Sequence, residues 1–208
     1  MENNTEEKKQ KQVQYSEKLE NDYKRAFEVL EKNGYVFEKS LSYQMPNLSN
    51  HLPAISRQVG IEIKETKLIQ EVFKFLENTN GKHLCLLGTC GTGKTLLATK
   101  IIPIIFCANF QKIFKVIKAC DLNDRLQEAK GYPFVVIDDF GTESTAVNFG
   151  NKVEAFSEVI DSVEGRKCFF VVTSNLDANQ IKHKYGVRTY DRLRGLFKVI
   201  QVNEKSMR

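Results

Sequence analysis

Short apolar runs alternate with amphipathic stretches along most of this chain. Four mainly apolar runs, at 84–87, 113–120, 134–141 and 166–175, have the length and composition of buried strands. The stretches at 63–78, 96–102, 122–129 and 154–163 favour helices. Strands that alternate with helices form a parallel sheet with helices on both faces, so the pattern predicts an α/β fold.

The first 60 residues have a different pattern. Residues 1–12 are polar and of mixed charge, whereas apolar side chains at 13–32 recur at roughly helical spacing, which predicts an amphipathic helix ended by Asn33-Gly34. Such a helix either packs on its own domain or docks on a partner protein, and both interpretations remain open. Residues 35–60 have a linker-like composition, with two prolines among polar clusters. We therefore divide the chain into a helical extension and linker at 1–50 and a main domain at 51–208.

A glycine-rich segment joins the strand at 84–87 to the helix at 96–102. It matches G-x-x-x-x-G-K-[ST], the phosphate loop of nucleotide-binding proteins, at eight consecutive positions: Gly88, Thr89, Cys90, Gly91, Thr92, Gly93, Lys94 and Thr95. Glycines let the backbone curl, so that its N–H groups and the positive end of the helix dipole cradle a polyphosphate. Lys94 is expected to reach the β- and γ-phosphates, and the Thr95 hydroxyl to hold Mg²⁺. The segment therefore predicts a site for ATP and Mg²⁺.

Polar residues at the ends of two later strands extend this candidate site. Asp138 and Asp139 end an apolar strand, where Asp138 is placed to bind Mg²⁺ and Asp139 to orient an attacking water. Asn175 ends the following strand and can hydrogen-bond the γ-phosphate or that water. Arg188 and Arg192 lie in an arginine-rich stretch, which is either a solvated basic helix or the source of a guanidinium for a nucleotide bound by the next subunit.

Composition limits the partners, the cellular compartment and the metal sites that we expect for this protein. The chain has 208 residues, 41% of them hydrophobic, and a formal net charge of +5, which permits contact with nucleic acid without requiring it. Its five cysteines show no C-x-x-C spacing and its three histidines lack partners at ligand spacing, so we expect a reducing cytoplasm and no cysteine or histidine metal site. No signal peptide or bilayer-spanning run is visible, so we expect no membrane partner.

Taken in order, these motifs resemble those of the AAA+ ATPases. The matching segments are the phosphate loop at 88–95, the apolar strand with its acidic pair at 134–141, the strand end at 172–175 and Tyr-Asp-Arg-Leu at 190–193. An Asp-Asp pair followed by an apolar residue and Gly is similar to the DnaC/DnaI helicase loaders and the related IstB transposition ATPases. The resemblance covers about residues 50–208.

The resemblance implies a P-loop NTPase core of the AAA+ type. Its sheet would have five parallel strands in the order 5-1-4-3-2, with 197–202 as the last strand. The chain stops soon after that strand, so no C-terminal helical lid with a sensor 2 arginine is expected.

The resemblance also assigns roles to the polar residues. Residues 88–95 would be Walker A, Asp138 and Asp139 Walker B, and Asn175 sensor 1. Arg192 is the preferred arginine finger and Arg188 the second choice. Many AAA+ proteins carry Glu in place of Asp139, and the shorter side chain is expected to weaken or slow ATP hydrolysis.

The function implied is that of a DnaC-like helicase loader in DNA replication. ATP binding would drive assembly of a homo-oligomer, with the arginine finger acting in trans, on single-stranded DNA around a hexameric replicative helicase. Two alternatives remain open: an IstB-like transposition ATPase that marks target DNA, and a nucleotide-gated adaptor with negligible turnover.

Overall fold

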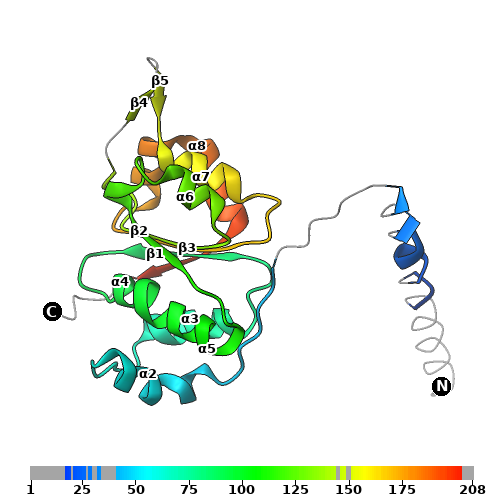
Figure 1. Cartoon of the computed structure of the whole chain (residues 1–208), viewed down its shortest axis with the longest axis horizontal. Coiled ribbons are helices and arrows are strands. Elements are labelled where there is room, and N and C mark those ends of the chain that lie inside the picture. Colours follow the sequence, from blue (N-terminus) through cyan, green and yellow to red (C-terminus); the bar gives the residue numbers. More distant parts are fainter. Residues whose placement is uncertain are drawn as a thin grey trace, which may run out of the picture. The chain divides into compact units, whose positions relative to one another are not determined.

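The computed structural model divides this chain into two units, Met1–Glu38 and Lys39–Arg208 (Figure 1). It describes residues 17–19, 21–26, 28–29, 32–33, 41–143, 146–148 and 151–202. In the first unit, residues 17–19, 21–26, 28–29 and 32 are helical, as predicted, and their side chains are exposed. The predictions for 1–16, 20, 27, 30–31 and 34–40 lie outside the described residues.

The second unit is built on a five-stranded parallel sheet. Its strands are β1 (His83–Gly88), β2 (Lys115–Lys118), β3 (Phe134–Asp138), β6 (Phe169–Ser174) and β7 (Phe197–Val202). They pair in the order β2-β3-β6-β1-β7, and every pairing is parallel. Counted along the chain, these five strands stand in the order 5-1-4-3-2, so the expected sheet is confirmed. A separate antiparallel hairpin of β4 (Ala146–Asn148) and β5 (Asn151–Val153) was not predicted.

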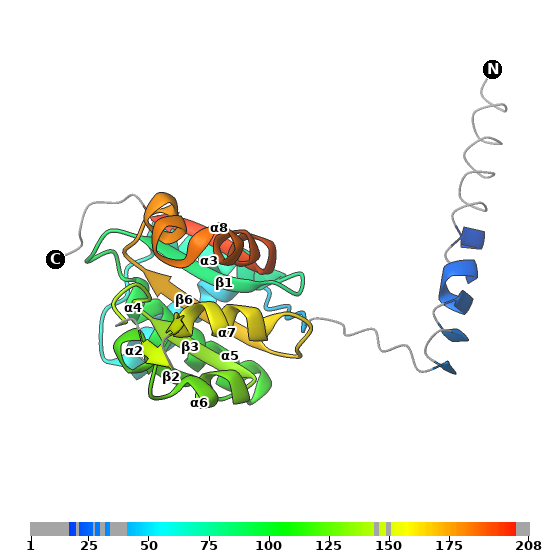
Figure 2. The ribbon, with the colours of Figure 1, turned by 90° about the horizontal axis from the view of Figure 1, so that it is seen from above.

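Helices cover both faces of the sheet (Figures 1 and 2). One face carries α2 (Leu52–Val59), α3 (Lys67–Glu77), the π-helical turn Leu97–Ile101 and α5 (Ile102–Phe110). The other carries α6 (Leu126–Gly131), α7 (Ala155–Val163) and α8 (Ala178–Leu196). Alternate residues of β3 enter the two cores: Phe134 and Val136 pack under α3 and α5, whereas Val135 and Ile137 pack under α7 and α8. Burial on both faces explains why the three central strands, β3, β6 and β1, are nearly uninterrupted apolar runs, whereas the edge strands β2 and β7 include exposed residues.

The segment before α3 is more ordered than its linker-like composition indicated. Tyr43 and Met45 are buried against the sheet unit, and the backbone N–H of Tyr43 donates to Thr79 Oγ1 at 2.9 Å. Helix α2 follows a short 3₁₀ turn (Leu48–His51), with Pro53 in its first turn. A proline there has no intrahelical hydrogen bond to lose, so it begins the helix rather than breaking it.

Several element boundaries differ from the predicted ones. The helix predicted at 96–102 is part of a continuous helical run, made of α4 (Lys94–Leu96), the π-helical turn and α5. Strand β2 is shorter than the predicted 113–120, because a 3₁₀ turn (Ala119–Asp121) replaces its end. Within the described part of the chain, no helix combines the length and apolar character needed to cross a membrane.

Candidate functional site

The loop between β1 and α4 is shaped by glycines at its two ends. Gly88 ends β1 at φ 148°, and a Cβ there would lie 2.3 Å from the backbone oxygen of Val202 on the neighbouring strand β7. Gly93 precedes α4 in the left-handed region, at φ 87°. Any other residue would clash at the first position or be strained at the second, so the sequence motif is required by the backbone path.

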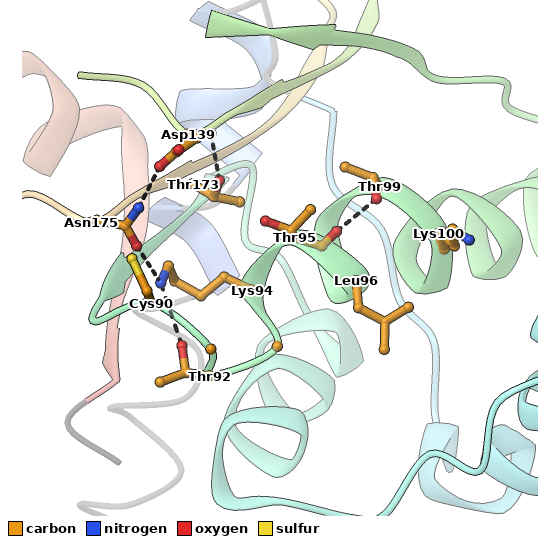
Figure 3. A pocket seen from close by; sticks show the side chains of 12 residues that line it. Cys90, Thr92, Lys94, Thr95, Leu96, Thr99, Lys100, Asp139, Thr173 and Asn175 are labelled. Carbon is orange, nitrogen blue, oxygen red and sulfur yellow. Dashed lines mark hydrogen bonds between the residues drawn. The ribbon is translucent and has the colours of Figure 1, made fainter. Parts of the chain in front are cut away.

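This loop forms one wall of a cavity of about 510 Å³. The cavity lies where β1, β3 and β6 end, at the carboxyl edge of the sheet, which is where α/β proteins bind ligands. It is lined by Cys90, Gly91, Thr92, Gly93, Lys94, Thr95, Leu96, Thr99, Lys100, Asp139, Thr173 and Asn175 (Figure 3). Three motifs that are far apart in the sequence therefore meet at one site.

Lys94 points across this cavity and is only 6% exposed (Figure 3). Its Nζ donates to the backbone oxygens of Gly88 and Thr89, both at 2.8 Å. It also donates to Asn175 Oδ1 at 3.1 Å and to Thr92 Oγ1 at 3.4 Å. The ammonium group is therefore held in place by oxygen atoms from both sides of the cavity.

The two adjacent carboxylates point in different directions. Asp138 is buried, and its Oδ1 accepts a hydrogen bond from Thr173 Oγ1 at 2.7 Å. The backbone N–H of Asp139 donates to the same Thr173 Oγ1 at 2.8 Å, and the Asp139 backbone turns into the left-handed region at φ 63°. Because of this turn, Asp139 lines the cavity while Asp138 lies behind Thr173.

Asn175 joins the acidic pair to the phosphate loop. Its Nδ2 donates to Asp139 Oδ1 at 2.6 Å, while its Oδ1 accepts from Lys94. A carboxylate on one side and an ammonium on the other fix the orientation of the amide. The Asn175 side chain is thus hydrogen-bonded to both Lys94 and Asp139.

Burial and charge shift the protonation equilibria at this site. Burial raises the pKa of Asp139, and the neighbouring Asp138 raises it further, while Lys94 opposes the shift. Burial lowers the pKa of Lys94, an effect that Cys90 and the two aspartates partly offset. Each charge therefore depends on the other for its stabilisation.

The donor set fits a nucleoside triphosphate with Mg²⁺. Lys94 supplies a cation for phosphate oxygens, and the Thr95 hydroxyl, which lines the cavity, is a hard oxygen ligand of the kind that Mg²⁺ prefers. The buried Asp138 carboxylate does not line the cavity, and it would act on bound Mg²⁺ through a water molecule. Among the described residues, no group of three or more His, Cys, Asp and Glu could hold a metal ion. Mg²⁺ is commonly bound through one or two protein ligands plus phosphates and waters, and it needs no such group.

A second cavity, of about 360 Å³, adjoins the first across the phosphate loop. The two share Thr92, Gly93 and Leu96, and the second is lined further by apolar side chains that include Ile63 and Leu97. An apolar cavity beside a phosphate cavity has the chemistry to take the base of a nucleotide.

The sequence model of the Novel STAND NTPase 3 family matches residues 64–205, which include every residue that lines the first cavity. This chain belongs to the Novel STAND NTPase 3 family. No curated protein sequence matches it. Among solved structures it is similar to the DnaC helicase loader, with a TM-score of 0.55 and 18% identity over 66% of this chain and 89% of that one. It is also similar to DnaI, with a TM-score of 0.54 and 21% identity over 77% of this chain and 96% of that one.

These similarities confirm the expected architecture for this NTPase family member. At such identities the likeness to DnaC and DnaI shows a shared fold, which is the P-loop α/β core that the motif order indicated. The expected likeness in fold to DnaC and DnaI is thus confirmed, and the roles of single residues rest on the geometry above.

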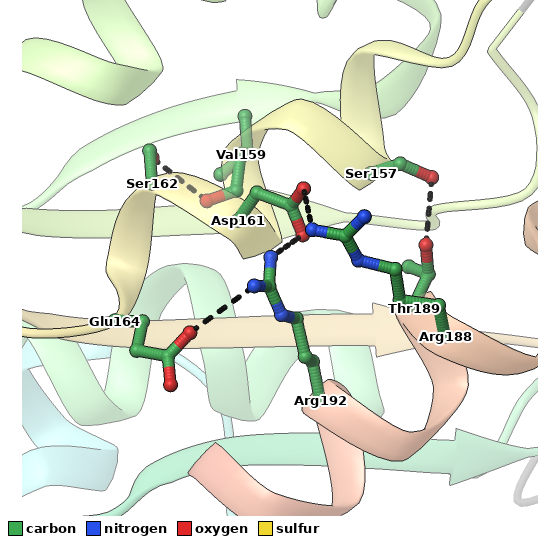
Figure 4. A network of polar contacts seen from close by, with 8 residues as sticks. All are labelled: Ser157, Val159, Asp161, Ser162, Glu164, Arg188, Thr189 and Arg192. Carbon is green, nitrogen blue, oxygen red and sulfur yellow. Dashed lines mark hydrogen bonds and ion pairs between the residues drawn. The ribbon is translucent and has the colours of Figure 1, made fainter.

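The two candidate finger arginines lie on α8, with Asp161 of α7 next to both (Figure 4). Neither is among the residues that line the cavity. Arg192 Nη1 forms an ion pair with Asp161 Oδ1 on α7, and its Nη2 lies 3.4 Å from Glu164 Oε2. Arg188 is much freer: its side chain is 76% exposed, and its Nη2 lies 3.8 Å from Asp161 Oδ2. The structure therefore separates both arginines from Lys94, Asp139 and Asn175, as a role toward a neighbouring subunit requires.

Sequence reasoning missed Thr173, Thr99 and Lys100, which also line the cavity. Thr173 binds both members of the acidic pair and lies two residues before Asn175 on β6. Because residues i and i+2 of a strand face the same side, this spacing was a signal that could have identified it. Thr99 donates from Oγ1 to the Thr95 backbone oxygen at 2.7 Å, a contact that has no sequence signature.

Proposed function

We propose that this chain binds ATP with Mg²⁺ and hydrolyses the ATP. The observation that carries the proposal is the single cavity in which Lys94, Asp139 and Asn175 meet at the carboxyl edge of the sheet. A phosphate loop alone predicts binding, whereas a carboxylate and an amide facing the same cavity supply groups for hydrolysis.

Each group has a proposed role. Lys94 binds the β- and γ-phosphates, and Thr95 with Asp138 holds Mg²⁺, which when bound neutralises charge on the phosphates. Asp139 orients the attacking water, and Asn175 fixes the Asp139 carboxylate through the 2.6 Å hydrogen bond. The other phosphate-loop residues, 88–93, contribute their backbone and a close approach to the ligand.

Hydrolysis in this proposal requires a homo-oligomer, because neither candidate arginine reaches the cavity of its own chain. Arg188 is the better placed to act in trans, since Arg192 is paired with Asp161 and Glu164. Arg192, which the sequence favoured, must leave these carboxylates to reach a neighbouring nucleotide. A guanidinium from a second copy stabilises charge that builds up in phosphoryl transfer.

We further propose that the protein loads a replicative helicase in the cytoplasm and assembles on single-stranded DNA. The shared fold with the DnaC helicase loader supports this, as do the five free cysteines and the net charge of +5. The helix of the first unit exposes Leu19, Tyr23 and Val29, and Tyr23 is 74% exposed. Exposed apolar side chains on a helix favour docking on a partner.

Nucleotide binding is tested with Lys94→Ala. Loss of a buried cation that donates charge-assisted hydrogen bonds is expected to weaken binding of a fluorescent ATP analogue by at least about 10- to 100-fold. Lys74→Ala is the matched control, because Lys74 is an exposed lysine on α3 that does not line the cavity. Equal affinity in both variants, or no binding by the wild type at millimolar analogue, would contradict the proposal.

The rate of ATP hydrolysis, and the partner that stimulates it, distinguish a helicase loader from a transposition ATPase and from a nucleotide-gated adaptor. ATP hydrolysis is measured alone and under three further conditions: with single-stranded DNA, with the hexameric helicase of the same source, and with a transposase of the same source. Stimulation by the helicase supports a loader, and stimulation by a transposase instead supports an IstB-like ATPase. Binding without turnover under all of these conditions identifies a nucleotide-gated adaptor.

A further inference from the structure

One buried carboxylate lies close to the site and takes no part in the proposed chemistry. Glu143 is 4% exposed and does not line the nucleotide cavity. Its Oε2 accepts a hydrogen bond from the backbone N–H of Gly141 at 2.7 Å, and its Oε1 accepts from the Tyr185 hydroxyl. A carboxylate is costly to bury unless it is hydrogen-bonded, and here both oxygens have a donor.

Lys184, next to Tyr185 on α8, also binds the loop that contains Gly141 and Glu143. Its Nζ donates to the backbone oxygen of Gly141 at 2.6 Å and to that of Glu143 at 3.2 Å. Two consecutive residues of α8 thus make three polar contacts with the loop that follows Asp139.

Aromatic packing fixes this loop as well. The rings of Phe140 and Phe156 are stacked, with centroids 4.1 Å apart. The buried Tyr185 ring lies 5.0 Å from Phe156 and 6.0 Å from Phe140. Phe140, the first residue after the acidic pair, is therefore packed between Phe156 of α7 and Tyr185 of α8.

The contacts between this loop and α8 join two parts of the proposed ATPase that have different functions. At one end, Asp139 directly precedes Phe140 and is bonded to Asn175 in the nucleotide cavity. At the other end, α8 leaves helical geometry at Gly186, with φ 85° and ψ 162°. Gly186 therefore divides α8 into two helical pieces, and its positive φ is a conformation that glycine adopts without strain. The half of α8 beyond Gly186 carries Arg188.

We propose that Glu143 and Tyr185 are positioning residues that couple the nucleotide site of one chain to the arginines it offers to its neighbour. The inference rests on the proposed function, because the arginines act only on a nucleotide bound by a second copy. A displacement of Asp139 reaches α8 through the Glu143 carboxylate and the Tyr185 hydroxyl, and it alters the direction of α8 at Gly186. The site that binds ATP thereby sets the position of the guanidinium that serves the next site.

The test asks whether nucleotide binding changes the structure of α8 beyond Gly186, and it does not depend on ATPase activity. Amide hydrogen exchange of 187–196 is followed in the full-length protein, with and without a non-hydrolysable ATP analogue. The wild type is expected to show a change in exchange across this segment on binding. Tyr185→Phe and Glu143→Gln are expected to bind the analogue with unchanged affinity and to lose that change. Tyr132→Phe, an exposed tyrosine away from the loop, is the control and keeps it.

A mixing experiment gives a second, kinetic readout. Subunits that lack both candidate arginines (Arg188→Ala with Arg192→Ala) are used in excess to supply wild-type ATP sites, and the arginine donor is either the wild type or Tyr185→Phe, each with its own nucleotide site intact. The kcat of the wild-type sites is expected to fall by between about 2- and 30-fold with unchanged KM, the range of typical coupling energies. If Tyr185 only stabilised the fold, Tyr185→Phe would lower kcat equally whether the donor or the subunit that holds the ATP site carried it.

The outcomes distinguish this inference from the function on which it rests. If the analogue binds and exchange at 187–196 is unchanged in the wild type, or changes equally in Tyr185→Phe and Glu143→Gln, the coupling is wrong. If the wild type does not bind the analogue, the proposed function is wrong. If one of the two variants fails to fold, the other carries the test, because each removes one side of the same hydrogen bond.

Discussion

At the scale of single residues, Asp139 has a backbone conformation that residues other than glycine rarely adopt. Its φ is 63°, in the left-handed region, where a non-glycine residue costs on the order of 1–3 kcal/mol. The turn is stabilised by the Thr142 hydroxyl, which donates to the Asp139 backbone oxygen at 2.8 Å, and by Thr173. The strain turns one carboxylate into the cavity while its neighbour Asp138 faces Thr173.

Asp139→Asn is expected to stabilise the fold at neutral pH and to lower ATP hydrolysis. Burial first, and Asp138 second, raise the folded-state pKa of Asp139 above its unfolded value, so ionisation of this group opposes folding. As the pH falls through the folded-state pKa, the native protein takes up the proton first and this penalty disappears. The Tm advantage of Asp139→Asn should therefore be largest near pH 7 and should shrink as the pH is lowered.

Asparagine suits this test because it tolerates the left-handed region. Asp191→Asn, at an exposed position on α8, controls for the same change of net charge. A Tm difference for Asp139→Asn that is constant across the pH range would show that Asp139 is not the titrating group.

Gly88→Ala is expected to destabilise the protein by about 1–3 kcal/mol or more, because a small-to-large change at positive φ adds a clash to backbone strain. The added Cβ would lie 2.3 Å from the Val202 backbone oxygen, which β7 cannot move without losing its pairing with β1. Urea unfolding measures the effect. Gly195→Ala is the control: it lies in α8 with open space around it and should stabilise the fold by about 0.5–1 kcal/mol. Similar effects of the two substitutions would argue against the close approach of the two strands.

At the scale of elements, α7 and α8 are joined by ion pairs that involve one candidate finger far more than the other. Arg192→Ala removes contacts with Asp161 of α7 and with Glu164, the residue that follows this helix, and is expected to lower stability by about 0.5–1 kcal/mol. Arg188→Ala should leave stability unchanged within about 0.5 kcal/mol, because the side chain is exposed and 3.8 Å from its nearest partner.

Urea unfolding of the two variants checks this difference. It also decides how activity measurements are interpreted, since a fall in ATPase activity for Arg188→Ala cannot then be due to unfolding. An equal loss of stability in both variants would mean that Arg188 is also held by α7.

Elements were predicted where their pattern was strong and local. Strand β1 was located to within one residue at each end and β3 at its first residue, because a strand buried on both faces is an uninterrupted apolar run. Strand β7 is only partly buried, and it was expected from the resemblance to the AAA+ ATPases. Helix α2 was missed because Pro46 and Pro53 indicate a linker, and only burial of Leu52 and Ile55 against the sheet unit makes the segment helical.

At the scale of the whole molecule, the second unit contains everything that the proposed ATPase needs. The buried residues of both cores lie between Tyr43 and Val202, and the nucleotide cavity lies within the same unit. A chain of residues 39–208 is therefore expected to fold, with a Tm within about 3 °C of the full-length protein and unchanged affinity for the ATP analogue.

Circular dichroism and the analogue titration test this prediction, with the full-length protein as reference. Binding of the helicase by the shortened chain is expected to be lost, because the exposed helix of the first unit has been removed. Retained helicase binding would place the docking surface on the ATPase unit, and loss of folding would contradict the division at Glu38 and Lys39.

The sequence by itself determined the phosphate loop, the five strands and the order in which they pair. These follow from constraints that act over a few residues, since glycine permits the curled loop and apolar runs form buried strands, and from a motif order shared with known ATPases. Only the tertiary structure decided that Lys94 meets Asn175, 81 residues away, and that Glu143 meets Tyr185. Such contacts depend on strand register and helix packing, which bring distant side chains together without any pattern in the sequence around each of them.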